Sequence, residues 1–148
     1  MNVQISKKAE LFFKALEDIW SAEQLQRGCA NNAVWHCTQA AEKILKGVLF
    51  CYGKAFENDH EFSSLLIAVE EVITLPQEIT IYINYFNRFG SGLRYKNMAN
   101  DPTVDDARTA ISRAKQIMQE FTKYPKTSEF IEEAEEVHIK MLKNLLAD

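Results

Sequence analysis

The feature that most limits how this chain can fold is the recurrence of apolar residues at helical spacing along almost its whole length. In residues 32–53 the apolar positions that repeat in this way are Val34, Cys37, Ala41, Ile44, Leu45 and Val48. Side chains three or four positions apart lie on one face of an α-helix. The prolines, Pro76, Pro102 and Pro125, fall between such segments, as expected for a helical chain. We therefore predict an all-α fold.

The periodic segments predict an up-and-down bundle of about five helices and an additional C-terminal helix. The expected ranges are about 4–27, 32–53, 60–73, 77–89, a fifth helix after residue 103, and 127–146. Residues suited to begin or end these helices are Gly28, Asn31 or Asn32, Gly53, Asp59, Thr103, and Thr127 or Ser128. The organisation we expect is a bundle domain over residues 1–125 and an acidic amphipathic helix over residues 126–148, packed on the bundle or on a partner subunit.

Residues 79–86 carry a competing pattern. Ile79, Ile81 and Ile83 alternate with polar or aromatic residues, which locally predicts a β-strand. No other segment offers a strand to pair with it, and a lone strand leaves its backbone N–H and C=O groups without partners. We therefore predict a helix here.

The chain is rich in apolar side chains for a bundle of this size. The expected inner face of the first helix consists of Ala9, Phe12, Phe13, Leu16, Ile19, Trp20 and Leu25. Further aromatic residues are Trp35, Phe50, Tyr82, Tyr85, Phe86 and Phe89. Because leftover apolar surface favours self-association, we expect a homodimer.

The charge distribution argues against a general nucleic-acid-binding surface. The net charge is −4, and the excess of acids lies in residues 127–148, while the rest of the chain is electrically balanced. No segment approaches the ~20 apolar residues that span a bilayer, and no targeting signal is evident, so we expect a cytoplasmic protein without membrane association. The three cysteines lack metal-type spacing, so we expect reduced thiols and no metal site.

Two short motifs in residues 32–53 resemble the second helix of HEPN domains, the higher eukaryote and prokaryote nucleotide-binding family. They are Gln39-Ala40-Ala41-Glu42-Lys43 and Leu45-Lys46-Gly47. His60 at the start of a new helix, and Leu93-Arg94-Tyr95 further on, fit the same family. The resemblance runs from about Ile5 to Tyr124 and implies an up-and-down helical bundle.

The resemblance also implies where an active site would lie. Ribonuclease members carry an arginine and, four to six residues downstream, a histidine, brought together across a dimer interface. The matching arginine here is Arg94, but residues 95–101 contain no histidine, and the next is His138. Cleavage through the 2′-hydroxyl of RNA needs a base for its proton as well as a cation for the phosphate. We therefore expect no catalytic residues, although the alternative is a ribonuclease toxin in which another residue replaces the histidine.

Without the histidine, the chain resembles the non-catalytic branch of the family. That resemblance implies a nucleotide-binding or interaction module that acts with a minimal nucleotidyltransferase, in a toxin–antitoxin-like pair. It implies no cofactor beyond a possible nucleotide ligand such as ATP. The candidate residues for nucleotide or phosphate binding are Arg94, Tyr95, Lys43, Glu42, Gln39 and Lys46.

Each candidate has a competing structural interpretation. Arg94 offers paired donors for a phosphate, but the same guanidinium could pair with a carboxylate such as Glu42 or Asp101. Tyr95 could stack on a base or pack within the fold. Glu42 and Lys46 are spaced to form an ion pair within one helix. A purely structural helical dimer also remains open.

Overall fold

The computed structural model describes residues 4–56, 61–89 and 101–147, and all regular elements within them are helical. The all-α prediction is therefore confirmed. The elements are α1 (Lys7–Leu25), α2 (Ala30–Cys51), α3 (Phe62–Glu70), α4 (Gln77–Tyr85), the 3₁₀ helix η1 (Phe86–Phe89), α5 (Val104–Phe121) and α6 (Pro125–Ala147). Asp59, His60, Arg94 and Tyr95 lie outside the described residues.

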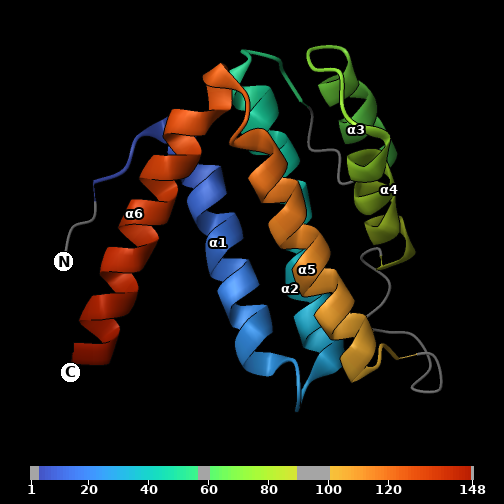
Figure 1. Cartoon of the computed structure of the whole chain (residues 1–148), viewed down its shortest axis with the longest axis vertical. Helices are drawn as coiled ribbons and strands as arrows, with labels where there is room; N and C mark the ends of the chain where they lie inside the picture. The colour runs from blue at the N-terminus through green and yellow to red at the C-terminus, as the bar shows by residue number, and fades with distance from the viewer. Residues whose placement is uncertain (1–3, 57–60, 90–100, 148) are drawn as a thin grey trace.

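Helix α2 is the centre of the bundle. It packs against α1 along one side and against α5 along another, with α3 and η1 also in contact (Figure 1). Helix α6 lies along the other flank of α1, and α4 packs on α5 at the opposite edge of the molecule. The six apolar positions predicted to face inward from residues 32–53 are all fully buried. The central helix therefore contributes a continuous face to the core.

The packing of α1 on α2 depends on a glycine. A Cβ atom added to Gly47 would lie 2.9 Å from the Cε1 atom of Phe12, and Phe12 is fully buried. Real Cβ atoms do not approach other atoms this closely, so the ring occupies the space that a side chain would need. Gly47 thus allows the two helices to pack closely.

The ambiguous segment after Pro76 is helical, as predicted, but in two parts. Residues 77–85 form α4, and residues 86–89 tighten into η1. Ile79 and Ile83 are buried one turn apart, whereas Ile81 is 55% exposed. This is the pattern of one helix face, because an alternating strand would place all three isoleucines on the same side.

Helix ends were predicted less accurately than helix centres. Helix α1 begins at Lys7 rather than near Gln4, and α2 begins at Ala30 rather than after a capping asparagine. Helix α3 ends at Glu70, and residues 71 and 72 form a turn. The predicted cap at Thr103 is confirmed, because its hydroxyl accepts from Asp106 N–H while the Asp106 carboxylate accepts from Thr103 N–H.

The turn between α5 and α6 is held by a buried hydroxyl. Thr127 is fully buried, and its hydroxyl donates to the carbonyl of Phe121 at 2.5 Å. Helix α6 begins at Pro125 and not at Thr127 or Ser128, the start that the sequence predicts. Proline suits the first turn of a helix, where its missing N–H would have had no partner.

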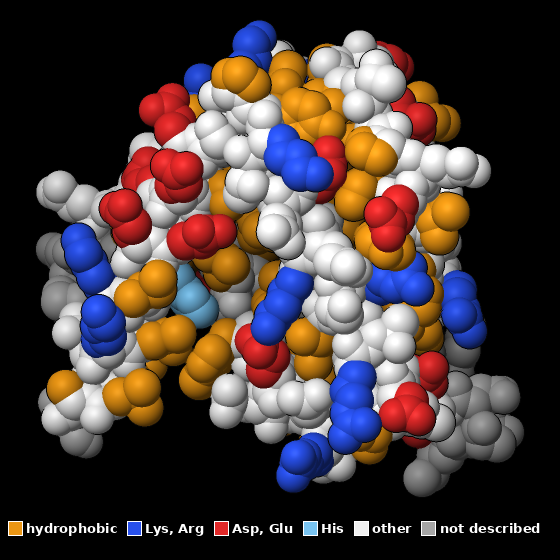
Figure 2. Space-filling model, viewed as in Figure 1, with side chains coloured by type: hydrophobic (Ala, Val, Ile, Leu, Met, Phe, Trp, Pro, Cys, Tyr) orange, Lys and Arg blue, Asp and Glu red, His pale blue; other side chains and the backbone are white. Residues whose placement is uncertain are grey.

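The prediction that Trp20 faces inward is wrong. Its side chain is 39% exposed, although the adjacent Ile19 is buried. The reason is that the far half of α6 does not close over this part of α1, and Figure 2 shows a hollow beside α6 with hydrophobic side chains along its edges. Of the other aromatic residues named from the sequence, Phe12, Phe86 and Phe89 are buried and Phe50 is 41% exposed, so some aromatic surface is left outside the core.

Candidate functional site

The polar residues of α2 divide into two separate groups. His36 and Lys43 both contact Asp18 of α1, whereas Glu42 and Lys46 pair with each other. Gln39, also on α2, is half-buried. Of the candidates on α2, Lys43 thus belongs to one group and Glu42 and Lys46 to the other.

The first group is organised by Asp18 on α1, a residue that the sequence analysis missed. Its side chain is buried and accepts from Lys43 Nζ at 2.5 Å and from His36 Nδ1 at 2.8 Å. A buried carboxylate is stable only when partners compensate for its lost hydration. The one signal in the sequence is its position, because Asp18 lies one turn from the buried Ala15 and Ala22. Lys43 is thus bound within the fold.

The second group is the predicted pair within one helix. Lys46 Nζ lies 3.4 Å from Glu42 Oε2, and the Lys46 ammonium also lies 5.9 Å from the centre of the Phe56 ring. Glu42 is only 7% exposed. These contacts bring together two of the candidates. Whether Arg94 and Tyr95 reach them stays a prediction.

A cluster of arginine and tyrosine side chains lies where α4 and η1 meet α5. It consists of Tyr82, Tyr85, Arg88 and Arg113, and is called the arginine–tyrosine cluster below. The Arg113 guanidinium carbon lies 4.1 Å from the centre of the Tyr82 ring and 5.7 Å from that of Tyr85. The Arg88 guanidinium carbon lies 5.6 Å from the centre of the Tyr85 ring. Two cations thus share one aromatic ring.

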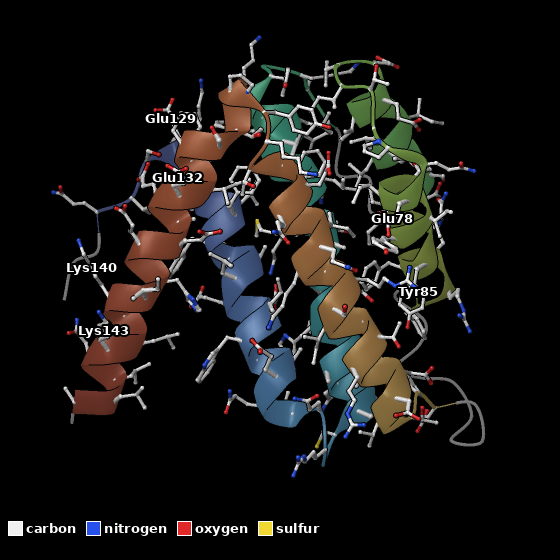
Figure 3. The ribbon with its side chains drawn as sticks, viewed as in Figure 1. Glu78, Tyr85, Glu129, Glu132, Lys140 and Lys143 are labelled. Carbon is white, nitrogen blue, oxygen red and sulfur yellow. The ribbon has the colours of Figure 1, made fainter. Side chains whose placement is uncertain are left out.

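The tyrosines of this cluster are fixed by hydrogen bonds. Tyr82 donates to Glu78 at 2.5 Å, and Tyr85 donates to the backbone carbonyl of Asp106 at 3.4 Å. Glu78 and Tyr85 are labelled in Figure 3. Burial raises the pKa of Tyr85, with a further contribution from Asp106, so its ring stays neutral at physiological pH. The two tyrosine rings therefore form an uncharged surface on which the two guanidinium groups lie.

Within residues 4–56, 61–89 and 101–147, Arg88 and Arg113 form no ion pair with a carboxylate, and the acids near them have other partners. Asp106 is held in the cap of α5, Glu78 accepts from Tyr82, and Asp105 pairs with Arg108 at 3.5 Å. A guanidinium stacked on a ring keeps the N–H groups along its edge free to bind an anion. The cluster could therefore bind a phosphate.

The described part of the chain shows neither a metal site nor a membrane span. No group of three or more histidine, cysteine or acidic residues in it is placed to hold a metal ion. None of its helices is long and apolar enough to cross a bilayer.

The helical architecture is shared with a known family. The sequence model of the HEPN domain matches residues 8–126. The chain belongs to the HEPN domain family. This HEPN domain comprises α1 to α5, whereas almost all of α6 lies beyond the match.

The fold of the HEPN domain is also found in a solved structure. The crystal structure of an archaeal HEPN homologue superposes with a TM-score of 0.63 and 21% sequence identity, over 78% of this chain and 94% of that one. At this identity the similarity concerns the fold. No curated protein matches the sequence closely enough to count as a relative.

Proposed function

We propose that this HEPN-domain protein is a nucleotide-binding interaction module that acts with a minimal nucleotidyltransferase, in a toxin–antitoxin-like pair. The observation that supports nucleotide binding is the arginine–tyrosine cluster. It combines two guanidinium groups, which suit phosphate oxygens, with aromatic rings, which suit a base. Arg94 and Tyr95 follow η1 by only a few residues in the sequence and supply the same two chemical groups.

The sequence supports binding rather than cleavage. Within the chain, no histidine follows Arg94 at the spacing of the ribonuclease members. The described cluster contains no group with a pKa suited to take a proton from a hydroxyl near neutral pH, since arginine stays protonated and the pKa of both tyrosines is raised. We therefore propose that the bound phosphate is held and not cut.

Calorimetry with ATP and other nucleotides tests the binding proposal. We expect Arg113→Ala and Arg94→Ala each to weaken nucleotide affinity about tenfold, as loss of one charged hydrogen-bonding group does. Arg27→Ala is the matched control, because Arg27 is exposed and belongs neither to the arginine–tyrosine cluster nor to the Arg94–Tyr95 pair. Circular dichroism would confirm that each variant is folded. Absence of binding at millimolar nucleotide would contradict the proposal and favour a structural helical protein.

Two further experiments separate the functional classes. Co-expression with a nucleotidyltransferase encoded by a neighbouring gene should give a complex that co-elutes in size-exclusion chromatography. Purified protein should not cleave RNA. Cleavage that is lost in Arg94→Ala would instead establish the ribonuclease alternative.

A further inference from the structure

A long groove runs over α1 between α5 and α6. It has a volume of about 620 Å³, and its apolar lining includes Ile19 and Trp20 of α1, Met118 of α5 and Leu142 of α6. A second hollow of about 460 Å³ shares Trp20 and Leu142 with it and extends toward the end of α6. The two hollows together are called the trough below. Each has the size of a site for a small organic molecule, since such sites usually measure about 300–1,000 Å³.

The charged side chains of the described residues that line the trough are mostly acidic. They are Glu23, Lys115, Glu132 and Glu135. Lys115 Nζ lies 2.9 Å from Glu23 Oε2, so these two charges compensate each other. Within the described part of the chain, neither Glu132 nor Glu135 has an ion-pair partner. Figure 2 shows acidic side chains gathered over the first half of α6, beside the hollow. The trough therefore carries negative charge that is not compensated.

The side chains around these two carboxylates supply no cation. Burial and the neighbouring Glu132 raise the pKa of Glu135, because both disfavour its ionised form. His138 also lines the trough, but burial lowers its pKa, so it adds no positive charge at physiological pH. Lys140 and Lys143 are exposed and are not among the residues that line the trough. A bound cation would therefore stabilise the ionised carboxylates.

The ring of Trp20 adds a surface that favours an organic cation. It is partly exposed and lines both hollows. The face of an indole ring attracts an ammonium group, more strongly than the ring of tyrosine or phenylalanine does. Leu145 and Leu146 of α6 are exposed and continue the apolar lining toward the end of the trough. A ligand that combines a positive charge with an apolar body would contact all of these groups.

We propose that the trough is a binding site for an organic cation, whose ammonium group lies at Glu132 and Glu135 and whose aromatic or alkyl body lies on Trp20 and Leu142. A metal ion fits less well, because the lining is largely apolar and no group of three ligating side chains in the described residues could hold one. The same carboxylates repel an anion such as a nucleotide. The trough shares no residue with the arginine–tyrosine cluster and is therefore separate from the proposed nucleotide site.

Three probes of similar size and different charge test the proposal by calorimetry with the full chain. They are naphthylmethylammonium, naphthylmethanol and naphthylacetate, which are a cation, a neutral molecule and an anion. We expect the cation to bind at least about tenfold more tightly than the alcohol, which lacks the charged contact, and the anion not to bind. Equal affinities for the cation and the alcohol, or no binding of the cation at millimolar concentration, would overturn the proposal.

A matched pair of double variants locates the ammonium group. Glu132→Gln with Glu135→Gln should weaken binding of naphthylmethylammonium about tenfold and leave binding of naphthylmethanol unchanged, because the shape of the trough is retained. Glu129→Gln with Glu136→Gln removes the same charge from exposed positions of α6 that do not line the trough, and should change neither affinity. Equal weakening by the two double variants would show a general effect of charge and would contradict the site. Circular dichroism verifies that both variants are folded.

The protein concentration distinguishes a small cation from another polypeptide as the occupant of the trough. We expect the affinity for naphthylmethylammonium to be the same at micromolar and at high micromolar protein, because a trough that is open to solvent has no competing occupant. An affinity that falls as the protein concentration rises would show that a second copy of the chain covers the trough. That result would overturn the proposal.

Discussion

Helix α1 has two flanks that are packed in different ways. Toward α2 it meets a helix whose glycine admits the Phe12 ring and whose lysine and histidine compensate a buried carboxylate. Toward α6 it borders a trough, and Trp20 is left partly exposed. The first flank lies within the residues that match the HEPN domain, and the second involves the helix beyond them. The comparison indicates that α1 packs more extensively against α2 than against α6.

The largest expected effect comes from Asp18→Ala. The substitution leaves His36 and Lys43 partly buried without their acceptor, so we expect a loss of about 3 kcal/mol in the free energy of unfolding. Urea denaturation measures this. Glu10→Ala is the control, because the Glu10–Lys14 pair of the same helix is exposed, with 3.7 Å between its charged atoms, and should cost at most about 0.5 kcal/mol. Equal losses in the two variants would contradict the comparison.

Gly47→Ala should have the next largest effect. The added methyl group meets the Phe12 ring, and the overpacking, offset in part by the better helix propensity of alanine, should cost about 1–2 kcal/mol. Gly28→Ala is the matched control, since nothing lies within 4 Å of its Cβ position. Thermal denaturation of both variants gives the difference. A stabilised Gly47→Ala would show that α1 and α2 can separate without cost.

On the other flank, Glu133→Gln should cost only about 1 kcal/mol. The Glu133 carboxylate accepts from both the N–H and the hydroxyl of Ser6, each at 2.7 Å, and so places a negative charge at the start of α1. Glu136→Gln removes an exposed acid of the same helix and serves as the control. If Glu133→Gln destabilised the protein as much as Asp18→Ala, the flanks would not differ as we infer.

The smallest expected effect is a pH dependence from His138. Burial lowers its pKa, against the opposing influence of Glu17 and Glu23, so the unfolded chain binds its proton more readily. Stability should therefore fall as the pH drops through the ordinary histidine pKa of about 6.5 and level off below the lowered value. His138→Gln should show a weaker decline between neutral and mildly acidic pH. An unchanged profile would assign the decline to other groups.

The sequence was sufficient for the fold because its strongest pattern, helical apolar spacing, is what the core uses. The segment after Pro76 shows why local propensity did not determine the secondary structure. Burial of Ile79 and Ile83 on one helix face against the bundle outweighs the β preference of isoleucine. Helix ends were less certain because they depend on individual hydrogen bonds, some of which come from distant parts of the chain. The Glu133–Ser6 contact at the start of α1, for example, joins residues that are far apart in the sequence.

The candidate site was less predictable because it also depends on contacts between residues that are far apart in the sequence. Side chains on one helix have known spacing, so the Glu42–Lys46 pair was foreseen. The partner of Lys43 lies on another helix, and only the packing of α1 on α2 identifies Asp18. Arg88 and Arg113 come from different elements and meet at Tyr85 only once α4 lies against α5. Arg94 and Tyr95 lie outside the described residues.

The buried Thr127 hydroxyl gives the chain a mechanical property. It anchors α6 at one end, next to the last turn of α5, and α6 as a whole spans 23 residues, or about 35 Å. A rotation of only ~5° at this anchor would displace the opposite tip by roughly 3 Å over such a length. Helix α6 also packs along α1, where Glu133 accepts from Ser6, so such a rotation would have to displace α1 as well.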